Sequence, residues 1–504
     1  MERKDFVRLT ASTGVFTLFG GFAWLLEGCK KMSMGSDMDM SGAIAVLNGN
    51  FDNPLRLFEI LDGSTMITLN AKKNKVSIIQ GKKSSVFGYG ESILAPIIKV
   101  SNGQSISINF QNNLEEDTNI HWHGLIIPEN MDGHPKYIVN QGSSFSYQFT
   151  INQRAGTNWF HPHPHMLTGK QVHKGLAGMF IVNDAEELAL NLPSNEFEIP
   201  LIIQDKRIYA DGSINYSPDS MDYMSGYFGD YICVNGSWSA FHNVKTKIYR
   251  FRILNGSNAR VYNLALSNGL NFTILGSDGG LLANSQSTNS ILLAPGERLD
   301  VLVNFSSIPV GTEIFLQNNS FNGGESQGLE SFKIMKFIVN EQESETFSIP
   351  STLSSVIPIL ETNAIKTRSF DIANAHAMAG GGHGGMNMGS IGSLHKIGGK
   401  SFEMDRIDET VSAGTTEIWE FDNSLGTDIH PMHLHGIQFQ VLSRTGGRGI
   451  IEAHEKGWKD TVLCLPAEKV KIIMTFPNNP GTFVFHCHNL EHEDSGMMLN
   501  YQII

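Results

Sequence analysis

The sequence predicts an all-β protein built from three consecutive antiparallel β-sandwich domains. Short segments that alternate apolar and polar residues recur along the chain, among them "SISINF", "YRFRIL", "LDVLVNF" and "EIWEF". Turn signals that contain glycine, often Asn-Gly, separate these segments, and the chain has 51 glycines. Its 504 residues, 17% of them charged, are enough to bury several hydrophobic cores. We expect domain one at about 45–188, domain two at about 189–345 and domain three at about 346–504.

Residues 1–29 have the features of an export signal. Charged residues come first, and the apolar run that follows is short and polar for a membrane-spanning helix, which is the alternative. The residues "LEGC" resemble a bacterial lipoprotein cleavage site with Cys29 as the lipidated residue, and "RKDFVR" loosely resembles a twin-arginine signal. We expect an exported protein of the bacterial periplasm or cell envelope, held on the membrane by a lipid anchor.

The overall charge gives no support to nucleic-acid binding. The formal net charge is -13 and the sequence pI is about 5.8, whereas nucleic-acid binding favours basic patches. An acidic surface is compatible with cationic substrates, and it also serves solubility alone.

One short stretch near the C-terminus, "VFHCHNLEHEDSGMM", is dense in metal ligands. Successive side chains of a strand point to opposite faces, so Cys487 faces one way while His486 and His488 face the other. One strand can therefore supply two metal sites. A thiolate, two imidazoles and a weak axial thioether form the ligand set of a blue-copper centre, and Cys487, His492 and Met497 provide three of these four ligands.

The missing imidazole has a candidate upstream, in "HPMHLHG". There His433 and His435 share a face, whereas His430 faces away from them in an extended strand. His430 can thus join Cys487, and the other two can join the histidines that flank this cysteine. The alternative is a set of satisfied core histidines around an inert buried thiol.

Paired histidines also occur early in the chain, and they expose an internal repeat. "GTNWFHPH" matches "GTFVFHCH", and the segment ending at His121 resembles the segment ending at His430. In the first copy Pro162 stands where Cys487 stands in the last. Domain one therefore keeps paired histidines without a mononuclear site, while domain two has no such pair and is expected to space the other two domains. The early histidines are His121 and His123 in "HWHG" and His161, His163 and His165 in "WFHPHPH".

Four His-x-His pairs supply eight imidazoles, which is too many for one ion and suits three copper ions. We expect domains one and three to hold this cluster between them. Reduction of dioxygen to water takes four electrons. Three cluster coppers and one blue copper can together store four electrons. The backbone at Cys487 would join the two sites over roughly 10 to 15 Å.

These four segments resemble the copper signatures of the multicopper oxidases, especially bacterial cuprous oxidases and laccase-like enzymes, from about residue 45 to 504. The resemblance implies three cupredoxin-like Greek-key domains and four copper ions. It implies type 1 ligands at His430, Cys487, His492 and Met497, and type 2 ligands at His121 and His433. It implies type 3 ligands at His123, His161 and His488 for one ion, and at His163, His435 and His486 for the other.

The resemblance also implies acidic residues that help deliver protons to the cluster. Asp132 in "ENMDGHP" and Glu493 in "EHED" stand at the matching positions. The alternative is that both are solvated carboxylates of exposed loops.

Two segments combine methionine with a glycine- or serine-rich composition: residues 30–44, and an insert at 373–397. Thioether and imidazole together suit Cu(I), although a plain tether is the alternative. Cuprous oxidases carry a methionine-rich insert over the type 1 site, and the insert here is shorter, with fewer methionines. Its candidate Cu(I) ligands are His376, Met378, His383, Met386, Met388 and His395.

Three functions follow, and all involve copper. The favoured one oxidises Cu(I) with O2 as acceptor and so removes toxic copper. The second is a laccase acting on phenols through the same coppers, and the third is a copper storage protein, which would not need Cys487 to join two kinds of site. We expect the remaining cysteines, Cys233 and Cys464, to be buried free thiols, with a disulfide between them as the alternative.

Overall fold

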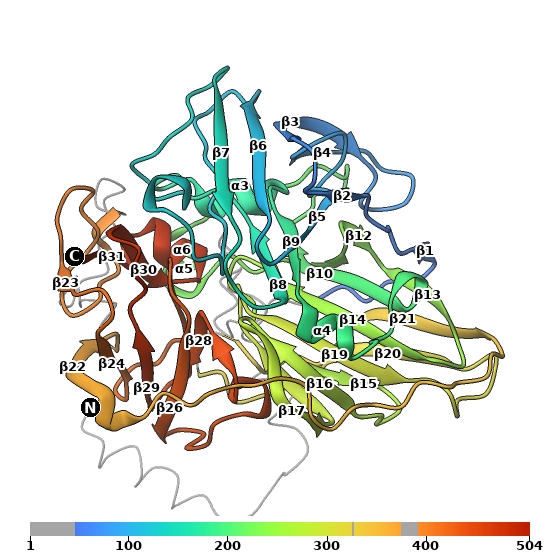
Figure 1. Cartoon of the computed structure of the whole chain (residues 1–504). Helices are drawn as coiled ribbons and strands as arrows, with labels where there is room; N and C mark the ends of the chain where they lie inside the picture. The colour runs from blue at the N-terminus through green and yellow to red at the C-terminus, as the bar shows by residue number, and fades with distance from the viewer. Residues whose placement is uncertain (1–45, 325–326, 374–391) are drawn as a thin grey trace, which may run out of the picture. The chain divides into compact units, whose positions relative to one another are not determined.

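The computed structural model of the chain describes residues 46–324, 327–373 and 392–504. Six β-sheets make up the fold of this part of the chain. Figure 1 shows how the strands are arranged. The sheets pack in pairs, and each pair encloses one hydrophobic core. The helices of the described ranges are short, and none of them is both long enough and apolar enough to cross a membrane. The predicted all-β class is confirmed. The prediction of purely antiparallel sheets is wrong, because some strands pair in parallel, such as β3 (Ile67–Val76) with β6 (Ser105–Asn112) and β10 (Glu198–Lys206) with β14 (Ile248–Asn255).

The first pair of sheets has four strands in each, in the orders β2-β5-β9-β8 and β4-β3-β6-β7. Strand β6 alternates buried and more exposed residues, as its sequence "SISINFQN" predicts. The elements are β2 (Ile60–Asp62), β3 (Ile67–Val76), β4 (Ser84–Gly88), β5 (Ile97–Ser101), β6 (Ser105–Asn112), η1 (Glu129–Met131), β7 (Ser144–Thr150), β8 (Gly156–Phe160), α3 (Thr168–Lys174) and β9 (Gly178–Asn183). Helices α4 (Ala185–Ala189) and η2 (Asn195–Phe197) lead to the second pair.

The second pair has six and seven strands, in the orders β1-β13-β21-β20-β15-β18 and β12-β11-β10-β14-β19-β16-β17. Strand β1 lies at the start of the range predicted for domain one, but it pairs with β13 of the second pair of sheets. The elements are β1 (Asn53–Pro54), β10 (Glu198–Lys206), α5 (Ser220–Ser225), β11 (Tyr231–Val234), β12 (Ser237–Trp238), β13 (Ala240–Lys245), β14 (Ile248–Asn255), β15 (Tyr262–Leu266), β16 (Phe272–Ser277), β17 (Gly280–Thr288), β18 (Ser290–Leu293), β19 (Arg298–Asn304), β20 (Glu313–Asn318) and β21 (Phe332–Glu341).

The third pair has five strands in each sheet, in the orders β22-β24-β29-β26-β27 and β23-β31-β30-β25-β28. Its core places Trp419 of one sheet against Phe485 of the other, with ring centroids 5.0 Å apart. The elements are η3 (Glu361–Asn363), β22 (Ala364–Asp371), β23 (Glu409–Val411), β24 (Thr416–Asn423), β25 (His430–Leu434), β26 (Phe439–Gly446), η5 (Ala453–Glu455), β27 (Trp458–Lys459), β28 (Thr461–Cys464), β29 (Glu468–Thr475), β30 (Gly481–Cys487), α6 (Leu490–Asp494) and β31 (Met498–Ile503).

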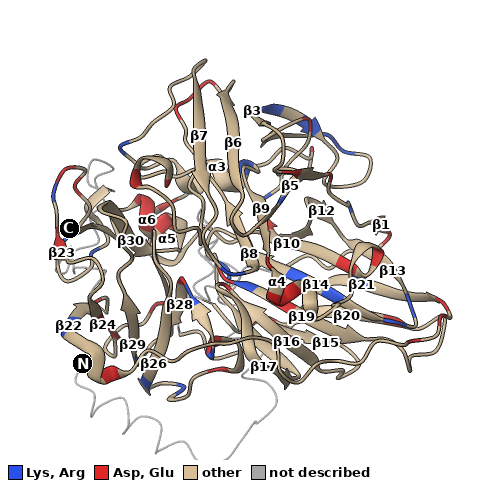
Figure 2. Cartoon of the chain, in the orientation of Figure 1, with Lys and Arg blue, Asp and Glu red and all other residues tan. Residues whose placement is uncertain are grey.

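Strand β14 departs from simple alternation, because all eight of its residues are buried. Its polar face carries Arg250 and Arg252, which bind Asp300 of β19 and Glu187 of α4. Figure 2 shows blue segments on β14 near the red of α4. Burial of charge is tolerated there because each guanidinium is paired with carboxylates.

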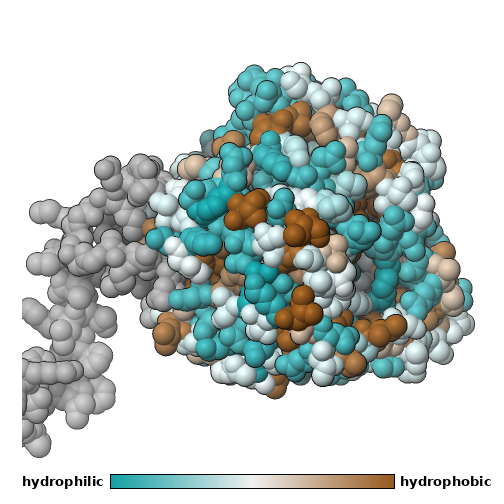
Figure 3. All heavy atoms as spheres, turned by 60° about the vertical axis from the view of Figure 1, so that its left-hand side comes forward, coloured by the Kyte–Doolittle hydropathy of each residue, from teal (hydrophilic) through white to brown (hydrophobic). Residues whose placement is uncertain are grey.

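One face of the molecule shows how exposed apolar residues are distributed. On the face drawn in Figure 3, hydrophobic side chains stand apart from one another among hydrophilic ones. Isolated exposed apolar residues of this kind are normal for a folded domain.

Candidate metal centres

Strands β25 and β30 pair in a register that separates two faces. His433 lies opposite His486, and Met432 lies opposite Cys487. Directly opposed residues of an antiparallel pair point to the same face, so the two histidines share one face and the cysteine points to the other. The alternation predicted around Cys487 is therefore present in the structure.

A mononuclear group forms on the cysteine face. The sulfur of Cys487 lies 3.6 Å from Nδ1 of His430 and 3.7 Å from Nδ1 of His492. The side chain of Asn489 accepts hydrogen bonds at the N-terminus of α6, and this turn brings His492 back toward the sulfur. The backbone N–H of Cys487 donates to the carbonyl of Met497 at 3.0 Å, so the backbone of Met497 runs next to that of Cys487.

The outer edge of this group is covered by His395 and by α5. His492 donates from Nε2 to the carbonyl of Met224 at 2.9 Å, which leaves Nδ1 as the nitrogen that faces the sulfur. The ring of His395 stacks on His492 with centroids 4.2 Å apart, and its Nε2 donates to the carbonyl of Tyr223 at 2.7 Å. The predicted ligand His395 is thus buried against the mononuclear group.

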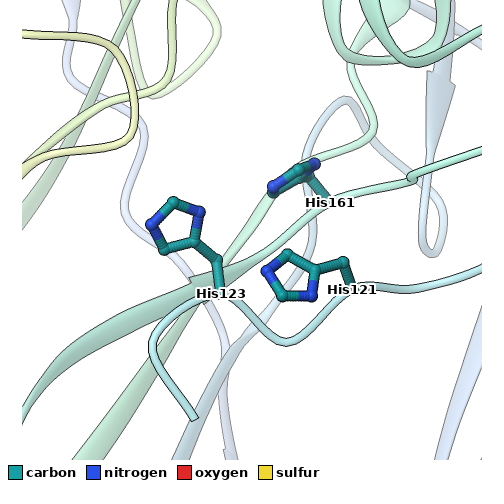
Figure 4. Close-up of side chains that lie close together, drawn as sticks. All are labelled: His121, His123 and His161. Atoms are coloured by element: carbon teal, nitrogen blue, oxygen red, sulfur yellow. The ribbon is translucent and has the colours of Figure 1, made fainter. Parts of the chain in front are cut away.

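A second group gathers the eight histidines of the four His-x-His pairs, all of them buried. His121 and His161 form a bridge between their segments, donating N–H to each other's carbonyls at 2.8 and 3.1 Å. Figure 4 shows their rings and that of His123 converging on one space. The eight are His121, His123, His161, His163, His433, His435, His486 and His488.

Several of these rings face one another with no proton between them. His121 donates from Nδ1 to the carbonyl of Asp132 at 2.7 Å, and His433 donates from Nδ1 to the carbonyl of Asp460 at 2.8 Å. Both Nε2 atoms therefore carry lone pairs, and they lie 3.4 Å apart. Two facing lone pairs cannot bond to each other, so this arrangement fits a cation shared between them.

The same arrangement recurs at His435 and His486. Their Nδ1 atoms donate to Oδ2 of Asp132 at 2.8 Å and to the carbonyl of Cys487 at 3.0 Å. Their Nε2 atoms lie 3.2 Å apart, and Nε2 of His163 is also 3.2 Å from that of His486. The three nitrogens form a second shared position for a cation.

The remaining rings are those of His123, His161 and His488, whose centroids lie 5.0 to 5.8 Å apart. His161 donates from Nδ1 to the carbonyl of Pro162 at 2.9 Å. Within the described part of the chain, its Nε2 and the Nδ1 of His123 are buried without a hydrogen-bond partner. Such buried acceptors indicate a missing ligand or ion.

The donor set fits copper. Metal ligation needs neutral imidazoles, and burial lowers the pKa of His161 to about 3 and that of His486 to about 4. A buried thiol between two imidazoles suits copper better than hard cations, which prefer oxygen ligands.

Comparisons with known proteins agree with this chemistry. Three family models described as multicopper oxidase match residues 70–187, 190–331 and 375–504. Multicopper oxidase mco of Staphylococcus haemolyticus is 34% identical over 442 residues, which cover 87% of this chain and 88% of that protein. The chain belongs to the multicopper oxidase family.

Two further relatives of the oxidase extend the comparison. The laccase of Bacillus subtilis is 33% identical and covers 82% of this chain and 89% of its own length. The crystal structure of McoA multicopper oxidase from Aquifex aeolicus has a TM-score of 0.80 and 38% identity, and it covers 90% of this chain and 99% of its own. The three pairs of sheets are cupredoxin-like domains, and the protein is a copper-dependent oxidoreductase that uses O2.

The two carboxylates predicted at the cluster of the oxidase lie there and are buried, not solvated in loops. Glu493 has one oxygen 3.5 Å from Nε2 of His163 and the other 3.2 Å from Nδ1 of His486. Burial raises the pKa of Asp132 and of Glu493 well above the ordinary range. The acidic residues of α6 are visible as a red helix in Figure 2.

Sequence reasoning missed two charged residues of the site, Arg298 and Asp460. Asp460 touches His123, and both of its oxygens accept from the guanidinium of Arg298. Arg298 stands in "GERLDVLVNF", where charges interrupt an otherwise apolar strand. That interruption signals a buried ion pair, but the partner lies 162 residues away and cannot be read from local sequence.

Some predicted residues of the oxidase are not placed. Cys29 and the candidate Cu(I) ligands His376, Met378, His383, Met386 and Met388 lie outside the described residues. Among the cysteines that the structure does describe, Cys233 and Cys464 are buried free thiols, as expected.

The two kinds of centre should differ in how pH affects copper binding to the copper-free oxidase. Between pH 7 and 5 the cluster imidazoles stay neutral, so cluster affinity should change by less than about threefold. Burial raises the pKa of the Cys487 thiol well above its ordinary value, so copper must displace a proton there. Affinity at that site should fall about tenfold per pH unit.

Copper titration of the apoprotein at pH 7, 6 and 5 measures both effects. Thiolate-to-copper absorption reports the Cys487 site, and total bound copper minus the copper at that site reports the cluster. A cluster affinity that falls in parallel with that of the Cys487 site would show that the imidazoles bind protons in this range.

Proposed function

We propose that the oxidase removes single electrons from Cu(I) at the mononuclear centre and uses four of them to reduce O2 to water at a trinuclear centre. The observation that carries the proposal is the position of Cys487 between His486 and His488. Its sulfur belongs to one group while its two neighbours belong to the other. A single strand thereby links the site of electron entry to the site of O2 reduction.

The proposed ligands follow from the groups that the structure brings together. His430, Cys487, His492 and Met497 would hold the type 1 copper. His121 and His433 would hold the type 2 copper. The type 3 pair would be held by His163, His435 and His486 on one side and by His123, His161 and His488 on the other.

When bound, the four coppers supply one-electron oxidation of the donor and a store of four electrons for O2. The protein's own residues keep the ligands neutral, orient them and exclude water. The bonds from His121 and His435 to Asp132 hold both rings with Nε2 inward. These hydrogen bonds fix the orientation of both rings.

Reduction of O2 to water also consumes four protons, and α6 is built to hold protons in the buried site. Glu493 faces the cluster, and burial raises its pKa well above the ordinary range, which favours its protonated form. Burial also raises the pKa of Glu491 to about 7 and that of Asp494 to about 8. Tyr216 donates to Glu491 at 3.1 Å and extends this acidic group outward from α6. We propose that these residues pass protons to the cluster through Glu493.

Cu(I) is the favoured donor for two reasons. The segment that ends at His395 is rich in methionine and histidine, which are suitable ligands for Cu(I). His395 stacks on His492, so a cation held by that segment would be delivered to the edge of a type 1 ligand. A laccase that oxidises phenols is the second candidate, supported by the relative from Bacillus subtilis that bears this name.

A storage protein without turnover fits the geometry less well. Storage needs ligands but gains nothing from a cysteine whose two neighbours bind a separate cluster. Buried carboxylates whose pKa values are raised are likewise suited to proton transfer and not to holding copper.

We also propose that the protein is exported and anchored by lipid at Cys29. The "LEGC" sequence and the preceding apolar run support this location, which would place Cu(I) oxidation in the periplasm or cell envelope.

Replacing Cys487 with Ser tests the link between the two centres. We expect this variant to lose the intense blue absorption and at least about 100-fold in oxidase activity, while it keeps most of its cluster copper. Replacing His163 with Ala is the reverse variant, which should keep the blue band and lose O2 reduction. Blue colour in the Cys487→Ser variant would contradict the type 1 assignment.

The choice between Cu(I) and phenols can be tested by deleting residues 376–391. We expect the KM for Cu(I) to rise at least about tenfold, because the soft ligands are removed, while phenol oxidation stays equal or increases. A variant with leucine in place of Met378, Met386 and Met388 is the matched control, because it keeps the length and apolar character of the segment. It should raise the KM for Cu(I) and leave phenol oxidation unchanged. An unchanged KM for Cu(I) would make the segment a tether and favour the laccase function.

The anchor is tested by expressing the full chain in a bacterium and analysing the mature protein by mass spectrometry. We expect an N-terminal Cys29 carrying acyl chains and partition into detergent, because two or more chains suffice for stable anchoring. The variant Cys29→Ala should stay unlipidated and unprocessed at this site. A mature wild-type protein that lacks Cys29 would contradict the proposal.

A further inference from the structure

Domain two reaches the histidine cluster through a buried group of charges. Arg298, at the start of β19, donates from Nη1 and Nη2 to the two oxygens of Asp460, at 2.7 and 2.5 Å. Both side chains are fully buried. A bidentate guanidinium–carboxylate pair fixes the plane of the carboxylate as well as its position.

Asp460 in turn touches two cluster histidines. Its Oδ1 lies 2.9 Å from Nε2 of His123, and its backbone carbonyl accepts from Nδ1 of His433 at 2.8 Å. The hydroxyl of Thr461 lies 3.1 Å from the former nitrogen and 3.2 Å from the latter. One residue thus contacts a proposed type 3 ligand and a proposed type 2 ligand.

His123 has a different orientation from its neighbours because of this contact. His121, His161 and His433 donate from Nδ1 to backbone carbonyls, so Nε2 is the nitrogen left to face the cluster. In His123 the Nε2–H donates to Asp460, and Nδ1 is the buried nitrogen without a partner among the described residues. The carboxylate therefore selects the tautomer and the inward-facing atom of this ligand.

Three more buried charged residues lie next to the pair of Arg298 and Asp460. Lys459 lies 2.9 Å from Oδ2 of Asp278 and 2.8 Å from Oε1 of Glu297, and all three are fully buried. The backbone N–H of Arg298 donates to Oδ1 of Asp278 at 2.9 Å. The group therefore has three carboxylates and two cations, drawn from domains two and three.

Gly296 completes the contact between this group and the cluster. It has a positive φ of 83°, and a Cβ there would lie 3.0 Å from the ring of His488 and 3.1 Å from that of His123. Domain two therefore packs directly on two of the proposed type 3 ligands.

Two other roles for Asp460 can be weighed. It lies close enough to His123 and His433 to be a metal ligand itself. However, both of its oxygens accept bonds from Arg298, so its charge is already matched. A purely structural ion pair is the second alternative, but such a pair would not need to touch two ligands.

We propose that Arg298 is a positioning residue for the trinuclear centre, which acts through Asp460 to set the inward-facing nitrogen of His123 and the ring of His433. Domain two is then part of the copper site and more than the spacer that its lack of paired histidines predicts. The proposal rests on the ligand assignment given above, which the copper content of the wild-type protein and the His163→Ala variant test separately.

The test replaces Arg298 with Lys, which keeps the charge but cannot bond both oxygens of Asp460. We expect apparent copper affinity at the trinuclear centre to fall about 10- to 100-fold, as is usual when a partner of a metal ligand is lost. Copper titration of the apoprotein and the electron paramagnetic resonance of the type 2 ion are the readouts. The blue band, which reports the Cys487 site, should remain.

Arg444→Lys is the matched control. Arg444 is a fully buried arginine that binds Glu455 through two nitrogens, and the contacts described for it include no proposed copper ligand. The Arg444→Lys variant should lower the melting temperature as Arg298→Lys does, but it should leave copper affinity and the resonance spectrum unchanged. Equal copper loss in both variants would overturn the proposal, because general destabilisation would explain it.

The variant Asp460→Asn tests whether Asp460 is itself a copper ligand. It also provides a second test of the proposal if Arg298→Lys does not fold. The amide keeps the volume but places an N–H group against the guanidinium, so the same loss of copper affinity is expected. Loss of copper in Asp460→Asn with normal binding in Arg298→Lys would make Asp460 a ligand and overturn the proposal. Normal copper content and spectrum in both variants would also overturn it.

Discussion

The metal centres depend on the pairing of β25 with β30. Because His433 lies opposite His486 and Met432 opposite Cys487, one ladder of backbone hydrogen bonds sends imidazoles to one face and a thiol to the other. A shift of one residue in this register would place the thiol among the cluster histidines and destroy both groups. The turn into α6 then needs only five residues to bring His492 back to the sulfur.

Burial makes the rest of the chemistry feasible. It lowers the pKa of imidazoles such as His161 and His486, which keeps them neutral and ready to bind a metal. It raises the pKa of Glu493 and of Asp494, which favours the protonated carboxyl groups beside a site that consumes protons. Burial away from water therefore has two useful effects: it favours neutral imidazoles, which can bind copper, and protonated carboxyl groups, which can donate protons.

All three domains contribute residues to the metal centres, but only two of them supply proposed copper ligands. Domains one and three supply the histidines, and α5 of domain two shields the mononuclear group through the carbonyl of Met224. Domain two also sends Arg298 to Asp460 and Gly296 against two cluster rings. The centre is thus formed by contacts among all three domains, although the ligands come from only two.

The sequence by itself determined the fold class, the copper family and the ligands on each face of Cys487, because strand alternation and ligand spacing are local properties. The cluster positions of Asp132 and Glu493 came from family motifs, which are also local. The tertiary structure decided what depends on distant packing: the stacking of His395 on His492, the inverted ring of His123 and the pairing of Arg298 with Asp460. Charges buried between domains leave no periodic signal, since each one is explained only by a partner elsewhere in the chain.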